Sequence, residues 1–128
     1  MGDTPPSLRS IDERVQSGSL PTNKGKVVSV LKTNVHVLTG KNATDEKVTD
    51  REEISIQFKY PLSDSVTFDF AHDGGFSLRQ FTEVVREGYQ RIYADATKYG
   101  VWGHTIGDLY IEGISEDAPG VFTLSMGS

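Results

Sequence analysis

The residues best suited to chemistry lie between Trp102 and Glu112. His104 and the carboxylates that follow it are residue types that act as acid–base pairs or bind metal ions. If the segment from Asp108 to Glu112 is extended, Asp108, Tyr110 and Glu112 point to one face, because side chains alternate along a strand. A structural explanation competes with this one: Trp102 plugs the sheet edge, Asp108 caps a turn and His104 is solvated. The spacing of His104 and Asp108 gives no strong ligand geometry and favours the structural explanation.

A second candidate site precedes the longest predicted helix, in the run His72-Asp73-Gly74-Gly75. Glycines that lead into a helix N-terminus can bind phosphate through backbone amides and the helix dipole. Here Asp73 would repel an anion, Ser77 already occupies the cap position, and no lysine follows as in a P-loop. A tight strand-to-helix turn explains the two glycines without a ligand.

Aromatic residues form the third candidate, because they could line a ligand cavity between a curved sheet and its helix. Core packing is the commoner use of aromatic residues at helical spacing. The residues concerned are Tyr89, Tyr93, Tyr99, Phe68, Phe70, Phe76 and Phe81. Tyr93 lies to one side of the apolar stripe, so it is the tyrosine expected to reach the surface.

Nucleophile arrangements are missing from the sequence. The chain has no cysteine, which excludes disulfides, thiolate metal sites and thiol nucleophiles, and it has no G-x-S-x-G elbow. The three histidines are His36, His72 and His104, and His36 shares a predicted strand face with Lys32 and Asn34, which favours solvent exposure. We therefore predict no catalytic residue, no metal site and no cofactor, and favour a non-enzymatic protein over an enzyme.

Charge narrows the class of partner. The formal net charge is −5, and no lysine or arginine follows Lys98, whereas Asp108, Glu112, Glu116 and Asp117 do. Nucleic-acid backbones and anionic membranes both require clustered basic residues. We therefore predict that the protein binds neither nucleic acid nor a membrane, and that its C-terminal hairpin is locally acidic.

Targeting signals are also missing from the sequence. No apolar run approaches the about 20 residues of a membrane span. The first residues have neither the basic nor the apolar region of a secretory signal. A cysteine-free chain fits a reducing compartment. These features predict a soluble intracellular protein, cytoplasmic or nuclear.

The helix is the best-determined element. Ser77 and Gln80 have the spacing of a capping box, and Gly100 can take the left-handed position after the last turn. Gly88 falls beside the apolar stripe, where a missing side chain would let a strand approach. The apolar residues at spacings of three and four are Leu78, Phe81, Val85, Tyr89, Ile92, Ala96 and Tyr99. The pattern predicts one helix from Ser77 to about Tyr99.

Alternating apolar residues predict the strands. They occur at 27–38, 54–60, 66–70, 109–114 and 121–126. The turn Pro61-Leu62-Ser63-Asp64 joins the second and third strands into a hairpin, and the charged segment 41–53 reads as a solvated loop. The order β-β-β-α-β-β predicts an α+β fold, in which one long helix packs on one face of an antiparallel sheet of about five strands.

The length of 128 residues corresponds to one domain. Residues 1–24 contain three prolines and no sustained apolar face, so we predict a flexible N-terminal arm that folding does not require. Residues 25–128 then form the single α+β domain.

These features favour a small acidic, non-enzymatic protein-interaction domain with a protein partner. The candidate binding residues are Trp102, His104, Asp108, Tyr110 and Glu112. Tryptophan and tyrosine are effective interface anchors, and acidic flanks steer a basic partner.

Two alternatives stay open. One is a small-ligand-binding protein or minor enzyme, with a pocket between helix and sheet near Trp102 and His104. The other is a homodimer that pairs the sheet face carrying Val28 and Val30 with its twin. A deep pocket beside Trp102 would favour the ligand-binding alternative, and a flat aromatic and acidic patch would favour the interaction domain.

Overall fold

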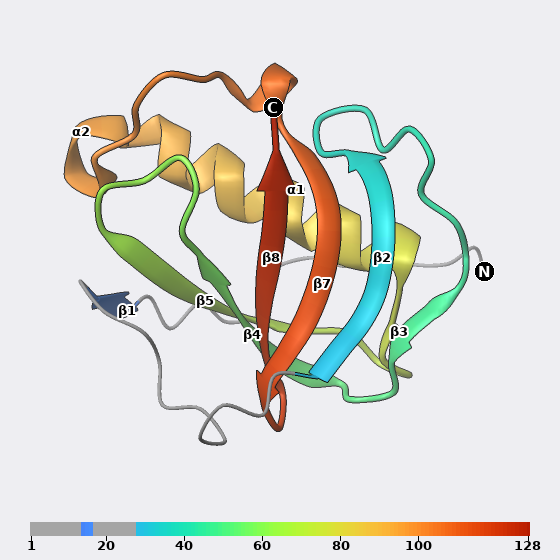
Figure 1. The fold of residues 1–128 in the computed structure, drawn as a ribbon. Helices are drawn as coiled ribbons and strands as arrows, with labels where there is room; N and C mark the ends of the chain where they lie inside the picture. Colours follow the sequence, from blue (N-terminus) through green and yellow to red (C-terminus); the bar gives the residue numbers. More distant parts are fainter. Residues whose placement is uncertain (1–13, 17–27) are drawn as a thin grey trace.

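The computed structural model describes residues 14–16 and 28–128, with side chains from Leu31 onward. One long helix covers one face of a six-stranded sheet (Figure 1), so the predicted α+β class is confirmed. The strands are β1 (Arg14–Gln16), β2 (Val28–His36), β3 (Lys47–Thr49), β4 (Glu53–Phe58), β5 (Ser65–Ala71), β6 (Phe76–Ser77), β7 (Tyr110–Ala118) and β8 (Val121–Gly127). The helices are α1 (Leu78–Ala94), α2 (Ala96–Tyr99) and the short 3₁₀ turn η1 (Ile106–Asp108).

The main sheet is mixed, not purely antiparallel as predicted. Its strand order is β1-β5-β4-β8-β7-β2. Neighbouring strands are antiparallel except for β4 and β8, which run parallel with Ser55 opposite Val121. The C-terminal hairpin docks onto β4 after the chain has crossed through α1. Side-chain alternation within a strand carries no information about that direction, so the sequence pattern could not predict it.

Four short elements lie where the sequence predicts none, namely β1, β3, β6 and η1. Strand β3 interrupts the predicted loop 41–53 and pairs with β6 in a separate two-stranded sheet. Strand β1 falls within the predicted N-terminal arm and pairs with β5. The rest of that arm lies outside the described residues, so its flexibility stays a prediction.

The core lies between α1 and the sheet. Phe58 on β4 meets Phe68 at a ring-centroid distance of 5.6 Å and Tyr89 on α1 at 5.0 Å. A Cβ atom at Gly88 would overlap the Phe58 ring, so the close approach predicted at this glycine is made by a side chain. Burial of each large apolar side chain contributes about 1.5–3 kcal/mol, and this stabilisation fixes the helix on the sheet.

The helix begins as predicted and ends differently. The Ser77 Oγ accepts a hydrogen bond from the Gln80 amide at 3.2 Å, and the Ser77 amide donates to Gln80 Oε1 at 2.9 Å, which confirms the capping box. Asp95 has φ −137° and ψ 56°, so it separates α1 from α2 and interrupts the predicted continuous helix. Gly100 takes the predicted left-handed conformation with φ 68°.

The connection from α2 to β7 crosses the upper end of the sheet in Figure 1. Its start is tied to the turn between β4 and β5, because the Trp102 amide donates to the Pro61 carbonyl at 3.0 Å and Val101 bridges Leu62. In the described part of the chain, no helix is long and apolar enough to span a membrane.

Candidate functional site

Trp102 lies on the surface and does not plug the sheet edge. Its side chain is 51% exposed, and among the described residues Leu38 is the other large hydrophobic residue with comparable exposure. Tyr60 meets the indole almost perpendicularly, with ring centroids 5.6 Å apart. The backbone of Trp102 is therefore fixed while a large part of its ring faces solvent.

His104 lies at the centre of the candidate site. Its ring is 5.7 Å from that of Tyr60 and 6.3 Å from that of Trp102. Its Nδ1 lies 3.7 Å from Asp108 Oδ2, and its Nε2 lies 3.3 Å from Ser128 Oγ. We call the rings of Tyr60, Trp102 and His104 the aromatic cluster.

Asp108 has the capping role that the structural explanation predicts. Its Oδ2 accepts a hydrogen bond from the Thr105 amide at 3.0 Å, at the start of η1. This hydrogen bond, followed by the proximity of His104, holds the pKa of the Asp108 carboxyl below its usual value. The side chain is nevertheless 51% exposed, so the carboxylate is charged and accessible at neutral pH.

The condition under which Asp108, Tyr110 and Glu112 would share one strand face is not met. Asp108 belongs to η1 and is not extended. The pairing of β7 with β8 shifts between Ile111 and Gly113, so Glu112 occupies a β-bulge, which redirects its side chain. Glu112 is exposed and its carboxylate lies against Gly127.

Tyr110 is half-buried and joins the site through a second histidine. The ring of His36 meets that of Tyr110 at 4.8 Å, and its Nε2 donates to the Gly107 carbonyl at 2.7 Å. His36 is itself half-buried, so the solvated face predicted for it is only partly exposed. The structure thus connects Trp102, His104 and Asp108 directly, and places Tyr110 beside the same loop.

Tyr60, Tyr93 and Ser128 also belong to this site, although the sequence does not predict them there. The Tyr60 and Ser128 hydroxyls lie 3.0 Å apart, and the Tyr93 hydroxyl donates to the His104 carbonyl at 2.8 Å. Tyr93 is half-buried, so it reaches the surface only in part. Burial, with Asp108 nearby, raises the Tyr93 pKa. The position of Tyr60, at the end of an alternating strand and directly before a proline turn, was the one available signal.

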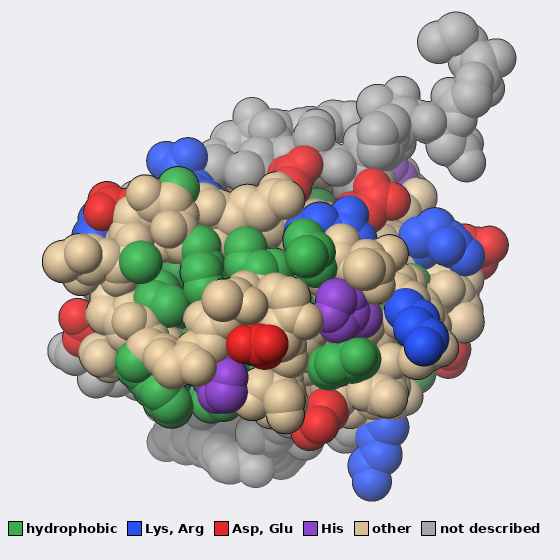
Figure 2. All heavy atoms as spheres, turned by 90° about the horizontal axis from the view of Figure 1, so that it is seen from above, with side chains coloured by type: hydrophobic (Ala, Val, Ile, Leu, Met, Phe, Trp, Pro, Cys, Tyr) green, Lys and Arg blue, Asp and Glu red, His purple; other side chains and the backbone are tan. Residues whose placement is uncertain are grey.

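Figure 2 looks onto this end of the molecule. Hydrophobic side chains gather in its centre, with histidine and acidic side chains among them, and basic side chains lie toward its edges. Hydrophobic, histidine and acidic side chains thus share this surface.

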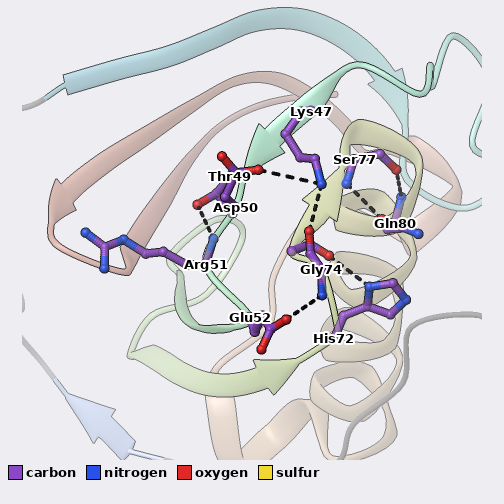
Figure 3. A network of polar contacts seen from close by, with 10 residues as sticks. Lys47, Thr49, Asp50, Arg51, Glu52, His72, Gly74, Ser77 and Gln80 are labelled. Atoms are coloured by element: carbon purple, nitrogen blue, oxygen red, sulfur yellow. Dashed lines mark hydrogen bonds and ion pairs between the residues drawn. The ribbon is translucent and has the colours of Figure 1, made fainter.

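The glycines before α1 form a structural turn (Figure 3). The Gly74 amide, which would have to bind a phosphate, donates to Glu52 Oε2 at 2.7 Å. Lys47 Nζ donates to the Gly74 carbonyl at 2.7 Å, and His72 Nδ1 donates to the Gly75 carbonyl at 2.8 Å. A carboxylate of the chain itself fills the anion position, which favours the tight-turn explanation.

The aromatic residues between helix and sheet pack in the core. Tyr89 is fully buried and its hydroxyl donates to the Tyr60 carbonyl at 2.7 Å, and this burial raises its pKa. The remaining buried members of the set are Phe68, Phe70, Phe76, Phe81 and Tyr99. These side chains fill the space between helix and sheet that a ligand cavity would require.

Two cavities lined by described residues lie elsewhere. One of about 360 Å³ lies where β4 and β5 meet the β7–β8 turn, beside Arg51 and Asp69. The other, of about 180 Å³, lies between the 39–43 turn and α1, beside Arg79 and Arg86. Neither is lined by Trp102 or His104, and the described residues contain no group of three or more side chains that could hold a metal ion.

Comparisons with known proteins give no match: no family model fits the chain, and no curated protein or solved structure is significantly similar to it.

Proposed function

We propose that this protein is a small acidic protein-interaction domain. Its binding surface is the end of the molecule that carries Trp102, His104, Asp108, Tyr110 and Glu112, which we call the loop surface. The observation that carries the proposal is the half-exposed indole of Trp102 on a fixed backbone. A large aromatic side chain held this way offers contact area at low entropic cost, as interface anchors do.

The loop that carries Trp102 is ordered by contacts on both sides. Tyr93 hydrogen-bonds the His104 carbonyl, His36 hydrogen-bonds the Gly107 carbonyl, and Asp108 accepts from the Thr105 amide. Ordering a loop during association reduces affinity, so a loop already held in place favours binding. These contacts support a recognition role over a purely connecting one.

An enzymatic role has less support. The Ser128 hydroxyl, the His104 imidazole and the Asp108 carboxylate follow one another in the order that a catalytic triad has. However, the 3.7 Å between His104 Nδ1 and Asp108 Oδ2 is too long for a hydrogen bond. The arrangement is also open to solvent, and neither described cavity adjoins it. A small-ligand or catalytic function is therefore the weaker alternative.

The test is capture of partners by the wild-type chain and by two variants. Trp102→Ala should lose the captured proteins while its free energy of unfolding stays within about 1 kcal/mol of wild type, because about half of the removed side chain is already exposed to solvent. Gln90→Ala, which truncates an exposed residue on α1, should capture the same proteins as wild type. Identical captured sets from Trp102→Ala and wild type, identified by mass spectrometry, would refute the proposal.

A further inference from the structure

The acidic groups of the loop surface differ from two acidic groups elsewhere that pair with arginine. Glu116 pairs with Arg51 at 3.1 Å, and Asp45 pairs with Arg79 at 3.0 Å. Within the part of the chain that the structure describes, neither Asp108 nor Glu112 pairs with a lysine or arginine. Both are exposed, and the sequence from residue 99 to residue 128 contains no lysine or arginine. The basic group closest to these carboxylates is therefore the imidazole of His104, 3.7 Å from Asp108, and no described lysine or arginine pairs with either of them.

The exposed indole likewise has no described lysine or arginine over its ring. An aromatic face attracts cations, and tryptophan does so best. The cation–π contact found among the described residues is made by Lys98, whose Nζ lies 5.2 Å from the centre of the Tyr99 ring. The neighbours of the Trp102 ring are Tyr60 and His104. Its exposed part is available to a cation from outside.

We propose that the loop surface binds lysine and arginine side chains of an extended basic segment in the partner. One cationic group lies over the Trp102 indole, and a second pairs with Asp108 or Glu112. The inference rests on the proposed interaction function and names the chemistry that this surface selects.

The spacing of the two subsites suits an extended chain. The imidazole of His104 is close to both subsites, with its ring 6.3 Å from the indole and its Nδ1 3.7 Å from the Asp108 carboxylate. Alternate side chains of a strand lie on one face, roughly 7 Å apart. Two basic residues separated by one other residue can therefore reach both subsites.

Other partner chemistries fit less well. An acidic segment would be repelled by Asp108 and Glu112. A purely apolar segment would cover Trp102 but would desolvate a charged carboxylate without providing a partner, which is costly. A basic side chain satisfies both subsites, because its apolar stem covers the ring and its head meets the carboxylate.

Nuclear magnetic resonance of the full chain provides the test. Trp102 is the one tryptophan in the sequence, so its indole N–H gives a single reporter resonance. The probes are three capped heptapeptides in which serine alternates with lysine, with norleucine or with glutamate. The lysine peptide should shift the indole resonance and the amides of residues 102–112 saturably. Raising the salt from about 0.01 M to about 0.1 M should weaken this binding, because the Debye length falls from about 30 Å to about 10 Å.

Norleucine keeps the apolar stem of lysine without the charge, so its peptide loses both the ion pair and the cation–π contact. It should bind at least about twofold more weakly, because each of these exposed contacts is worth about 0.2–1 kcal/mol. Equal affinity of the two peptides, or lysine-peptide shifts outside residues 102–112, would overturn the inference. If the norleucine or glutamate peptide shifted the same resonances and bound as tightly as the lysine peptide, the proposed interaction surface would stand, but its preference for basic side chains would not. That result would separate failure of this inference from failure of the proposed function. No saturable shift by the lysine peptide would also overturn the inference.

Two pairs of variants locate the subsites. Asp108→Asn should weaken lysine-peptide binding by about two- to fivefold, whereas Asp50→Asn, which removes the same charge from an exposed position near the β3–β4 loop, should leave it unchanged. Trp102→Leu keeps an apolar side chain without an aromatic face and should weaken binding by about two- to fivefold, whereas Trp102→Phe should lose less. Equal effects of Asp108→Asn and Asp50→Asn would contradict the assignment of the carboxylate subsite.

Discussion

The turn around Gly74 and the loop around Trp102 have similar compositions, but their polar and aromatic side chains have opposite surroundings. Both combine glycines, a histidine, an aromatic residue and nearby acidic residues. In the turn, Glu52, Lys47 and His72 all bond to the backbone of the two glycines. In the loop, the backbone is held while the indole and the carboxylates face solvent.

The difference shows how a structural turn can be separated from a candidate site of the same composition. At the Gly74 turn the amide that could bind an anion already has a carboxylate partner from within the chain. At the loop surface Asp108 and Glu112 form no ion pair with a described lysine or arginine, and Trp102 is 51% exposed. The deciding property is whether the polar and aromatic groups are satisfied internally, and composition does not reveal it.

The largest expected difference between the two regions concerns their aromatic residues. Phe76 in the turn is fully buried, with its ring 5.8 Å from that of His72, so Phe76→Ala should destabilise the protein by about 3–5 kcal/mol. Trp102→Ala should cost less than about 1 kcal/mol. Urea unfolding followed by circular dichroism measures both without relying on tryptophan emission. Equal losses of unfolding free energy in the two variants would place the indole in the core and contradict the difference between turn and loop.

Alanine substitution of a glycine should also destabilise the protein more in the turn than in the loop, by a smaller difference than for the aromatic residues. Gly75 has φ 93°, and a Cβ atom there would overlap the Thr49 carbonyl, whereas Gly103 has φ 77° and open space around it. Alanine at either position incurs a left-handed backbone cost of about 1–2 kcal/mol. We expect Gly75→Ala to cost about 1–3 kcal/mol more than Gly103→Ala in chemical denaturation, because of the overlap. A larger loss for Gly103→Ala would mean that the loop is the more tightly packed region.

The acidic residues of the loop surface should affect association more than dissociation. Combining Asp108→Asn with Glu112→Gln should slow binding of a basic partner by about two- to tenfold and reduce its salt dependence, because rim charges steer the approach. Stopped-flow mixing with the lysine peptide measures the rate. Glu52→Gln, in the turn, serves as the control and should leave the association rate unchanged. An effect confined to the dissociation rate would contradict steering.

The smallest expected effect concerns the stability contributed by Asp108. Its pKa is lower in the folded state than its ordinary value, so its contribution is present above the ordinary value and is lost as the pH falls through the folded pKa. The difference in unfolding free energy between wild type and Asp108→Asn should therefore narrow between pH 7 and pH 3. A difference that widens with acid would contradict the hydrogen bond from the Thr105 amide as its cause.

Local signals in the sequence predicted the local structure well. The capping box of Ser77 and Gln80 and the left-handed Gly100 depend on residues within one turn of each other, so both could be predicted from spacing. The break at Asp95 was not predicted, because the apolar spacing of the stripe continues past it to Tyr99.

Contacts between distant segments could not be predicted in this way. The parallel pairing of β4 with β8 depends on how the last hairpin docks, and the approach of Tyr60 and Ser128 to His104 depends on that pairing. Candidate residues in the Trp102 loop were found because they are consecutive in the sequence. Their partners are distant in the sequence, because Tyr60 follows β4, Tyr93 lies on α1 and Ser128 follows β8.

Quenching of Trp102 emission by caesium and by iodide tests the central claim, an exposed indole in acidic surroundings, most directly. We expect red-shifted emission that both ions quench, with caesium more effective relative to iodide than it is for free N-acetyltryptophanamide, because negative charge concentrates cations near the ring. Blue-shifted emission that neither ion quenches would contradict the account, since it would place the indole in the core.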